Sequence, residues 1–167
     1  MKAKMRLFVV VLMTVALLTA LFPTTGLAMD NKTYYTGKEC PVEITEMGVW
    51  TPLPHGLFRV TGLHSWHSDT TTDPRLTGAD YVVVNAVGDP VAGYGTFWGT
   101  FEVVNDGGSW SGQWVGREEN GGFTINGLLH GSGGYDGLVA NWGLRPIYDE
   151  QGCVALTGYI VETGAGN

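Results

Sequence analysis

Positive charge is scarce in this sequence, which carries nine lysine and arginine residues against sixteen aspartate and glutamate residues. Three of the nine, Lys2, Lys4 and Arg6, lie within the first six residues. Without residues 1–28, six basic residues face all sixteen acidic ones, and the net charge is −10. An acidic surface repels phosphate backbones and anionic lipid headgroups. We therefore expect no nucleic-acid partner and no binding to an anionic membrane surface.

Cysteine is equally rare, with only Cys40 and Cys153 in the chain. Zinc centres need several cysteine or histidine ligands at close spacing, and neither cysteine has such a neighbour. An even number of cysteines in an exported protein favours pairing. We predict a Cys40–Cys153 disulfide, with two free thiols as the alternative.

Long apolar runs are absent except at the N-terminus, where residues 7–22 are almost entirely apolar. The run follows the basic start of the chain and precedes the small residues Gly26 and Ala28. At about 16 residues it is shorter than the roughly 20 that a membrane-spanning helix needs. This three-part pattern predicts a signal peptide over residues 1–28 and a secreted or periplasmic protein. A membrane anchor is the alternative.

Helical periodicity is missing from the rest of the chain, while glycine occurs 26 times and is spread evenly. Short segments of alternating polar and apolar residues recur between clusters of Gly, Asp, Asn and Pro, which is typical of strands and turns. We expect a lead-in over residues 29–40, one β domain over 41–163, and a flexible loop over 68–75. Eight strands are predicted, at 41–50, 57–67, 76–87, 92–104, 109–118, 123–131, 135–144 and 153–162.

Short hairpin turns join most of these strands, most clearly at residues 105–108 (Asn-Asp-Gly-Gly) and 119–122 (Glu-Asn-Gly-Gly). Asn, Asp and Gly tolerate the positive φ of tight hairpins. Consecutive hairpins predict an all-β, single-domain, eight-stranded antiparallel up-and-down barrel, since closure removes exposed edges. Such a barrel has room for packed side chains or one small ligand. Cys40 directly precedes the first predicted strand and Cys153 begins the last, and the starts of these two strands lie at opposite ends of the barrel. The predicted disulfide therefore needs Cys40 to reach back, or one strand to be offset.

Glycines also lie inside the predicted strands, close to aromatic residues, as at Gly99, Gly112 and Gly158. Glycine weakens a regular strand, but strongly coiled barrel strands use glycine kinks that aromatic side chains cover. We therefore interpret these glycines as structural.

Four segments occur in a distinctive order: 73–78 (DPRLTG), 98–102 (WGTFE), 105–112 (NDGGSWSG) and 131–138 (GSGGYDGL). In this order they resemble a family of uncharacterised exported bacterial β-barrel proteins. The glycine- and aromatic-rich hairpins are similar, more loosely, to the barrels of allene oxide cyclase and dirigent proteins, which hold apolar ligands in eight antiparallel strands. The resemblance implies a barrel fold. No position matches the catalytic residues of those families, so it assigns none here.

Candidate metal ligands do not form a convincing set. His64 and His67 are three residues apart, and such residues point to opposite faces of a strand. They are not expected to share a metal, so we predict no metal site and no cofactor.

Candidate catalytic groups are equally weak. The carboxylate pairs Glu43 with Glu46 and Asp69 with Asp73 are expected on solvated strand faces and as loop caps. Serines in the 109–112 hairpin lack a nucleophile-elbow sequence and a defined base. We predict no catalytic residue.

Aromatic residues carry the functional hypothesis. If Phe97 and Phe101 fill the barrel, alternation places Trp98 on its outer surface. An aromatic cluster at a barrel mouth or outer face could grip a sugar ring or a flat apolar ligand, whereas glycine cover and core packing are the structural alternative. The predicted ligand-binding residues are Trp98, Trp110, Trp114 and Tyr135.

The function expected from these residues is non-catalytic binding of a small apolar or carbohydrate-like ligand. One alternative is a structural or protein-interaction module of the cell envelope. Another is a cyclase- or isomerase-like enzyme with an apolar barrel lumen, in which a polar side chain facing the lumen would act on the substrate.

Overall fold

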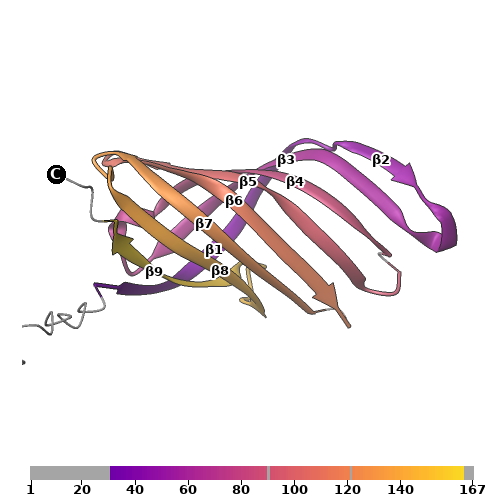
Figure 1. Cartoon of the computed structure of the whole chain (residues 1–167). Coiled ribbons are helices and arrows are strands. Elements are labelled where there is room, and N and C mark those ends of the chain that lie inside the picture. Colours follow the sequence, from indigo (N-terminus) through magenta and orange to yellow (C-terminus); the bar gives the residue numbers. More distant parts are fainter. Residues whose placement is uncertain (1–30, 90, 121, 164–167) are drawn as a thin grey trace, which may run out of the picture. The chain divides into compact units, whose positions relative to one another are not determined.

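Strands make up almost all of the structure, a computed structural model that describes residues 31–89, 91–120 and 122–163 (Figure 1). The predicted signal peptide, residues 1–28, lies outside the described residues. Two short 3-10 helices, η1 (Pro54–Gly56) and η2 (Pro74–Leu76), join strands. The strands are β1 (Thr33–Glu46), β2 (Val49–Pro52), β3 (Phe58–Thr71), β4 (Gly78–Asp89), β5 (Tyr94–Asn105), β6 (Gly108–Glu119), β7 (Gly122–Gly133), β8 (Leu138–Tyr148) and β9 (Val154–Glu162).

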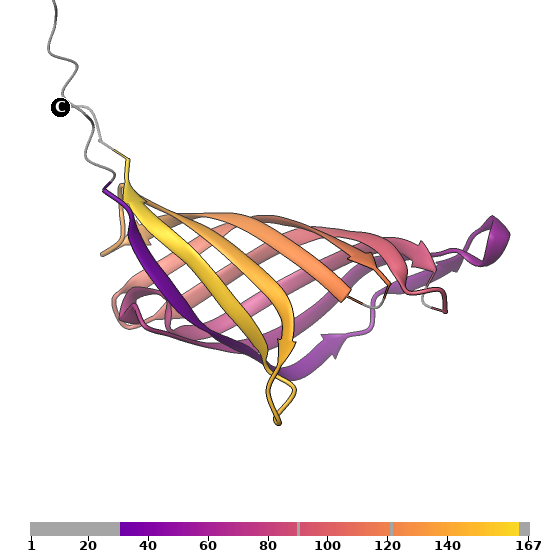
Figure 2. The same ribbon diagram turned by 90° about the horizontal axis from the view of Figure 1, so that it is seen from below.

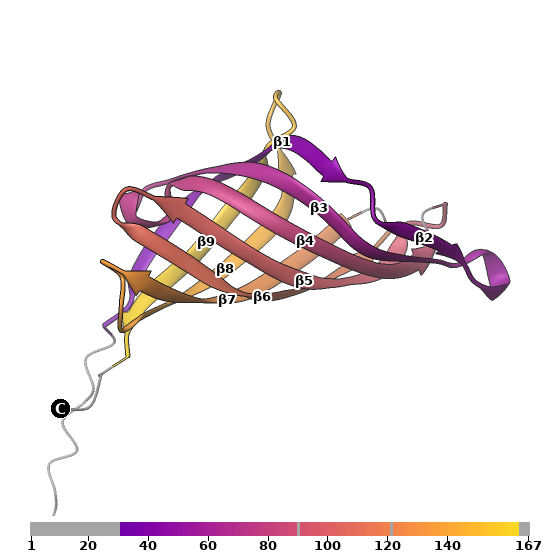
Figure 3. The same ribbon diagram turned by 90° about the horizontal axis from the view of Figure 1, so that it is seen from above.

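The sheet closes on itself through β1. Strands β3 to β9 pair in sequential order, and β1 pairs antiparallel with β9 on one side and β3 on the other. Figure 2 shows β1, in indigo, beside β9, in yellow. Eight strands therefore form the predicted antiparallel up-and-down barrel. A ninth strand, β2, was not predicted from the sequence; it continues along the free part of β3 beyond β1 (Figure 3).

Alternation along each strand separates the interior from the surface. In β5, Phe101 and Val103 are buried, whereas Trp98 is 40% exposed on the opposite face, as the sequence predicted. Burying these apolar side chains is the main favourable contribution to folding. The buried core consists of Tyr35, Leu76, Val82, Phe101, Val103, Trp110, Trp114, Leu129, Tyr135, Ala140, Trp142, Leu144, Leu156 and Ile160.

Glycines on the inner face permit close contact between strands. A Cβ atom on Gly99 would lie 1.7 Å from the carbonyl oxygen of Val83 and 3.0 Å from the ring of Trp114. Only glycine fits there, and an aromatic ring covers the bare backbone, as predicted. The covering rings come from other strands rather than from sequence neighbours. Further examples are Phe101 over Gly127 and Tyr35 over Gly158.

The Cys40–Cys153 disulfide forms, with Cα atoms 4.2 Å apart. Strand β1 begins at Thr33, eight residues earlier than predicted, so residues 33–40 are strand rather than lead-in. Because Glu39 pairs with Val154, Cys40 lies in the middle of β1, beside the residue that precedes β9. This offset resolves the conflict between the disulfide and barrel closure. Disulfides persist in oxidising compartments, so the bond fits a protein of such a compartment.

Residues 68–75, predicted to be a flexible loop, instead complete β3 and form the ordered turn η2. Asp73 accepts hydrogen bonds from the backbone and the guanidinium of Arg75, so its predicted role as a loop cap is confirmed. Leu76 is 1% exposed, and the indole of Trp110 donates to the Arg75 carbonyl at 2.7 Å. The turn is therefore packed firmly against the barrel.

Within the described ranges, no helix has the length and apolar character to span a membrane.

Removing the disulfide should destabilise the barrel. The bond closes a loop of 113 residues, and the chain-entropy estimate for such a loop is about 4–5 kcal/mol. We expect the double variant Cys40→Ser/Cys153→Ser to unfold at a much lower urea concentration than the wild type, by circular dichroism. An unchanged midpoint would show that the bond adds nothing to stability.

Candidate functional site

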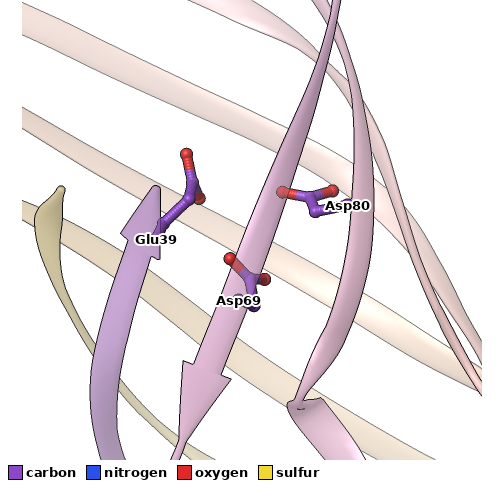
Figure 4. Close-up of side chains that lie close together, drawn as sticks. All are labelled: Glu39, Asp69 and Asp80. Atoms are coloured by element: carbon purple, nitrogen blue, oxygen red, sulfur yellow. The ribbon is translucent and has the colours of Figure 1, made fainter. Parts of the chain in front are cut away.

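Three carboxylates lie together inside the barrel, on the strands where it closes. Glu39 on β1, Asp69 on β3 and Asp80 on β4 are 4%, 2% and 0% exposed. Glu39 pairs directly with Asp69. Asp80 pairs with His67, which lies two residues before Asp69 on β3. Alternation turns all three side chains inward, where one oxygen of each lies within 4.8 Å of the others (Figure 4).

Only one of the six carboxylate oxygens has a hydrogen-bond partner among the described residues. Oε1 of Glu39 lies 2.7 Å from Nδ1 of His67, whose Nε2 lies 2.9 Å from the hydroxyl of Ser65. Oε2 of Glu39 and both oxygens of Asp69 and Asp80 are buried and unpartnered. Isolated buried carboxylates are strongly unfavourable, so this cluster must take up positive charge, as protons or as a cation.

The electrostatics of the interior agree with this requirement. Burial raises the pKa of Asp80, and the charge of Glu39 raises it further. Burial likewise raises the pKa of Asp69, with added repulsion from Asp80 and Glu39. The pKa of Tyr35 is also raised, first by burial and then by Asp69 and Asp73. This part of the interior therefore disfavours further negative charge and attracts positive charge.

This cluster of carboxylates was not predicted from the sequence. Asp69 was expected on a solvated face or as a cap, but the structure buries it in the interior, while Glu39 and Asp80 were not singled out. For Asp80 the alternation along the strand could have predicted burial, because Asp80 lies on the same face as the apolar residues Val82 and Val84.

The two histidines diverge as predicted. His67 faces inward and contacts Glu39, whereas His64 contacts the hydroxyl of Tyr81 on the other face of the sheet. They do not form a joint site.

The four predicted ligand-binding residues do not form one site. Trp110 and Tyr135 are buried, and their rings stack with centroids 5.2 Å apart. Tyr135 donates to Asn105 at 2.6 Å, and Asn105 donates to carbonyls of the η2 turn. Trp114 is buried over Gly99. Trp98 alone of the four is substantially exposed.

Trp98 lies in a groove of about 640 Å³ on the outer face of β4 to β7. An adjoining groove of about 700 Å³ shares Val83, Thr100, Gln113 and Leu128 with it, so the two form a continuous surface depression. We call the first of these, the groove that contains Trp98, the outer groove. The outward-facing residues that line it are Val83, Asn85, Trp98, Thr100, Gln113, Val115, Asn126 and Leu128.

The fold and the disulfide define the chain as an eight-stranded antiparallel β-barrel protein, the architecture that the resemblance to allene oxide cyclase and dirigent barrels implied. No protein-family model, curated protein or solved structure matches the chain.

The buried carboxylates should make stability depend on pH when divalent cations are removed by a chelator. Because the pKa of Asp80 is raised above its usual 3.8 in the folded protein, folding favours its protonated form. The free energy of unfolding should therefore fall as pH rises from about 4 towards neutral. In the Asp80→Asn variant the free energy of unfolding should fall less steeply with pH. The slopes of the two proteins should differ by up to about 1.4 kcal/mol per pH unit, the contribution of one titrating group.

Thermal unfolding between pH 5 and pH 8 measures this dependence. The range avoids the acid titration of Asp73, whose pKa is lowered mainly by its hydrogen bond to Arg75. Asp136→Asn, the same change at an exposed turn residue, is the control. Equal slopes for the wild type and Asp80→Asn would contradict the assignment.

Proposed function

We propose that this protein is a non-catalytic binding module that holds a carbohydrate-like ligand in the outer groove. The observation that carries the proposal is Trp98, whose ring is 40% exposed in a depression that also contains three side-chain amides. A sugar ring offers an apolar face of C–H groups that stacks on an indole, together with hydroxyls that pair with amides.

The polar groups of the outer groove favour a sugar over a purely apolar ligand. Gln113 and Asn126 supply amide donors and acceptors, and Thr100 supplies a hydroxyl. An apolar ligand would cover these groups without giving them hydrogen-bond partners, which is costly. None of the residues named as its lining is charged, so a neutral ligand matches the site.

The groove is also built on a rigid support. Its side chains come from four hydrogen-bonded strands, and Asn85 accepts a hydrogen bond from the backbone of Gly62 at 3.1 Å. Beneath it, the ring of Trp114 packs over Gly99. A site on fixed strands loses little conformational entropy on binding.

A protein-interaction role is the second candidate, favoured by exposed apolar side chains on the same face. Val115 and Leu128 in the outer groove and Val104 nearby on β5 are 61%, 49% and 44% exposed. A cyclase- or isomerase-like activity is less favoured, because the inward carboxylates of Asp69 and Asp80 are closed off from solvent.

The binding proposal is tested with the purified protein on a glycan array, followed by titration of the strongest glycan with tryptophan emission as the signal. We expect Trp98→Ala to weaken binding about thirtyfold, which corresponds to the roughly 2 kcal/mol of a central aromatic contact. Trp50→Ala is the matched control, because Trp50 is 50% exposed on β2 and lies outside the groove.

Two results would overturn the proposal. One is the absence of binding to any glycan on the array. The other is an equal loss of affinity in Trp98→Ala and Trp50→Ala, which would place the ligand elsewhere. If the wild type binds no glycan but forms dimers that Trp98→Ala disrupts, the protein-interaction role replaces it.

A further inference from the structure

The oxygens of the interior carboxylates lie close enough together for all three side chains to reach one cation. One oxygen each from Glu39, Asp69 and Asp80 lies within 4.8 Å of the others. Calcium binds oxygen ligands at 2.3–2.6 Å, so two ligands on opposite sides of the ion lie about 4.6–5.2 Å apart. Magnesium dehydrates reluctantly and usually keeps several waters, so a site closed off from solvent favours calcium.

A second observation comes from the unpartnered oxygens. Asp80 is completely buried, and both of its oxygens lack hydrogen-bond partners within the described residues, as do both oxygens of Asp69. Both side chains point towards Glu39 (Figure 4). Buried polar atoms are almost always satisfied in folded proteins. An ion between the three carboxylates would satisfy one oxygen of each, and bidentate binding would satisfy more.

The basic side chains that form ion pairs are engaged elsewhere. Lys38 pairs with Asp149 at 3.1 Å, Arg75 with Asp73 at 2.7 Å, and Arg117 with Glu119 at 2.7 Å. His67 is the basic group that touches the cluster, through Oε1 of Glu39. Three ionised carboxylates therefore outnumber the one imidazole that contacts them, and the ionised cluster carries a net negative charge.

The contact with His67 also prepares Glu39 as a ligand. The chain Ser65–His67–Glu39 fixes one carboxylate oxygen and leaves Oε2 free inside the barrel. Metal-binding groups are commonly oriented by such outer hydrogen bonds, whose loss typically reduces metal affinity 10- to 100-fold.

We propose that Glu39, Asp69 and Asp80 bind one divalent, oxygen-preferring cation, with calcium the best match. The ion would join β1, β3 and β4 on the side of the barrel where β1 closes against β3. Its role would be structural, close to the disulfide at Cys40. The proposal is independent of the outer groove.

The test loads the ion during folding, because the carboxylates are closed off from solvent. The purified protein is unfolded in guanidinium chloride and refolded with its disulfide intact, in excess CaCl₂, in excess MnCl₂ or in EDTA, and then passed through a desalting column. Elemental analysis should find about one equivalent of calcium or manganese per chain. The melting temperature should exceed that of the EDTA sample by about 5 °C or more.

Two variants assign the site. Asp80→Asn should fold, since it removes an unpaired buried charge, but its metal affinity should fall at least tenfold and its melting temperature should become independent of calcium. Glu43→Gln, on the same strand as Glu39 but exposed, should behave as the wild type. Trp98→Ala should also keep its metal, so failure of the glycan experiment leaves this test intact.

The proposal is overturned if the wild type retains neither calcium nor manganese and shows no thermal shift. It is also overturned if Asp80→Asn binds metal as tightly as the wild type. The first result would mean that protons alone neutralise the interior carboxylates, and the second that the metal does not use Asp80.

Discussion

Closure of the barrel depends on the two-sided pairing of β1. Its first seven residues hydrogen-bond to β9, and its second half to β3. Because the earlier part of β3 has no β1 partner, β2 occupies that edge. The disulfide lies where β9 begins beside the middle of β1. Glu39 lies on β1 as well, facing the carboxylates of Asp69 on β3 and Asp80 on β4. Strand β1 therefore combines the backbone, covalent and electrostatic constraints of the molecule.

Alternation and hairpin turns were enough to predict the barrel and most of its strands. They failed where the inward residues are polar or small, because hydrophobic periodicity is then hidden. In β1 the inward positions after Tyr35 are Gly37 and Glu39, so the strand appeared to begin later than it does. The polar composition around Asp69 and Asp73 likewise suggested a loop, whereas burial and capping make this segment ordered.

The candidate sites show a similar division. Parity correctly separated Trp98 from Phe97 and Phe101, but a single sequence does not state which strand face turns inward. Asp69 and Asp80 lie on the consecutive strands β3 and β4, but Glu39 joins them only through the closure of β1 against β3, so no local motif unites all three. Three of the four segments behind the family resemblance meet at one end of the barrel, through Arg75, Asn105, Trp110 and Tyr135. Their distinctive sequence is explained there by packing rather than by ligand binding.

The pairing of the first strand with the last also bears on how the chain is made. A fragment that lacks residues 154–162 leaves one edge of β1 and one edge of β8 without their partners. During synthesis, the hairpins between β3 and β8 can form in order as they emerge, because their contacts are local. The interior is complete only after the C-terminal strand has left the ribosome, so a truncation near residue 153 would leave a sheet with two open edges rather than a smaller barrel.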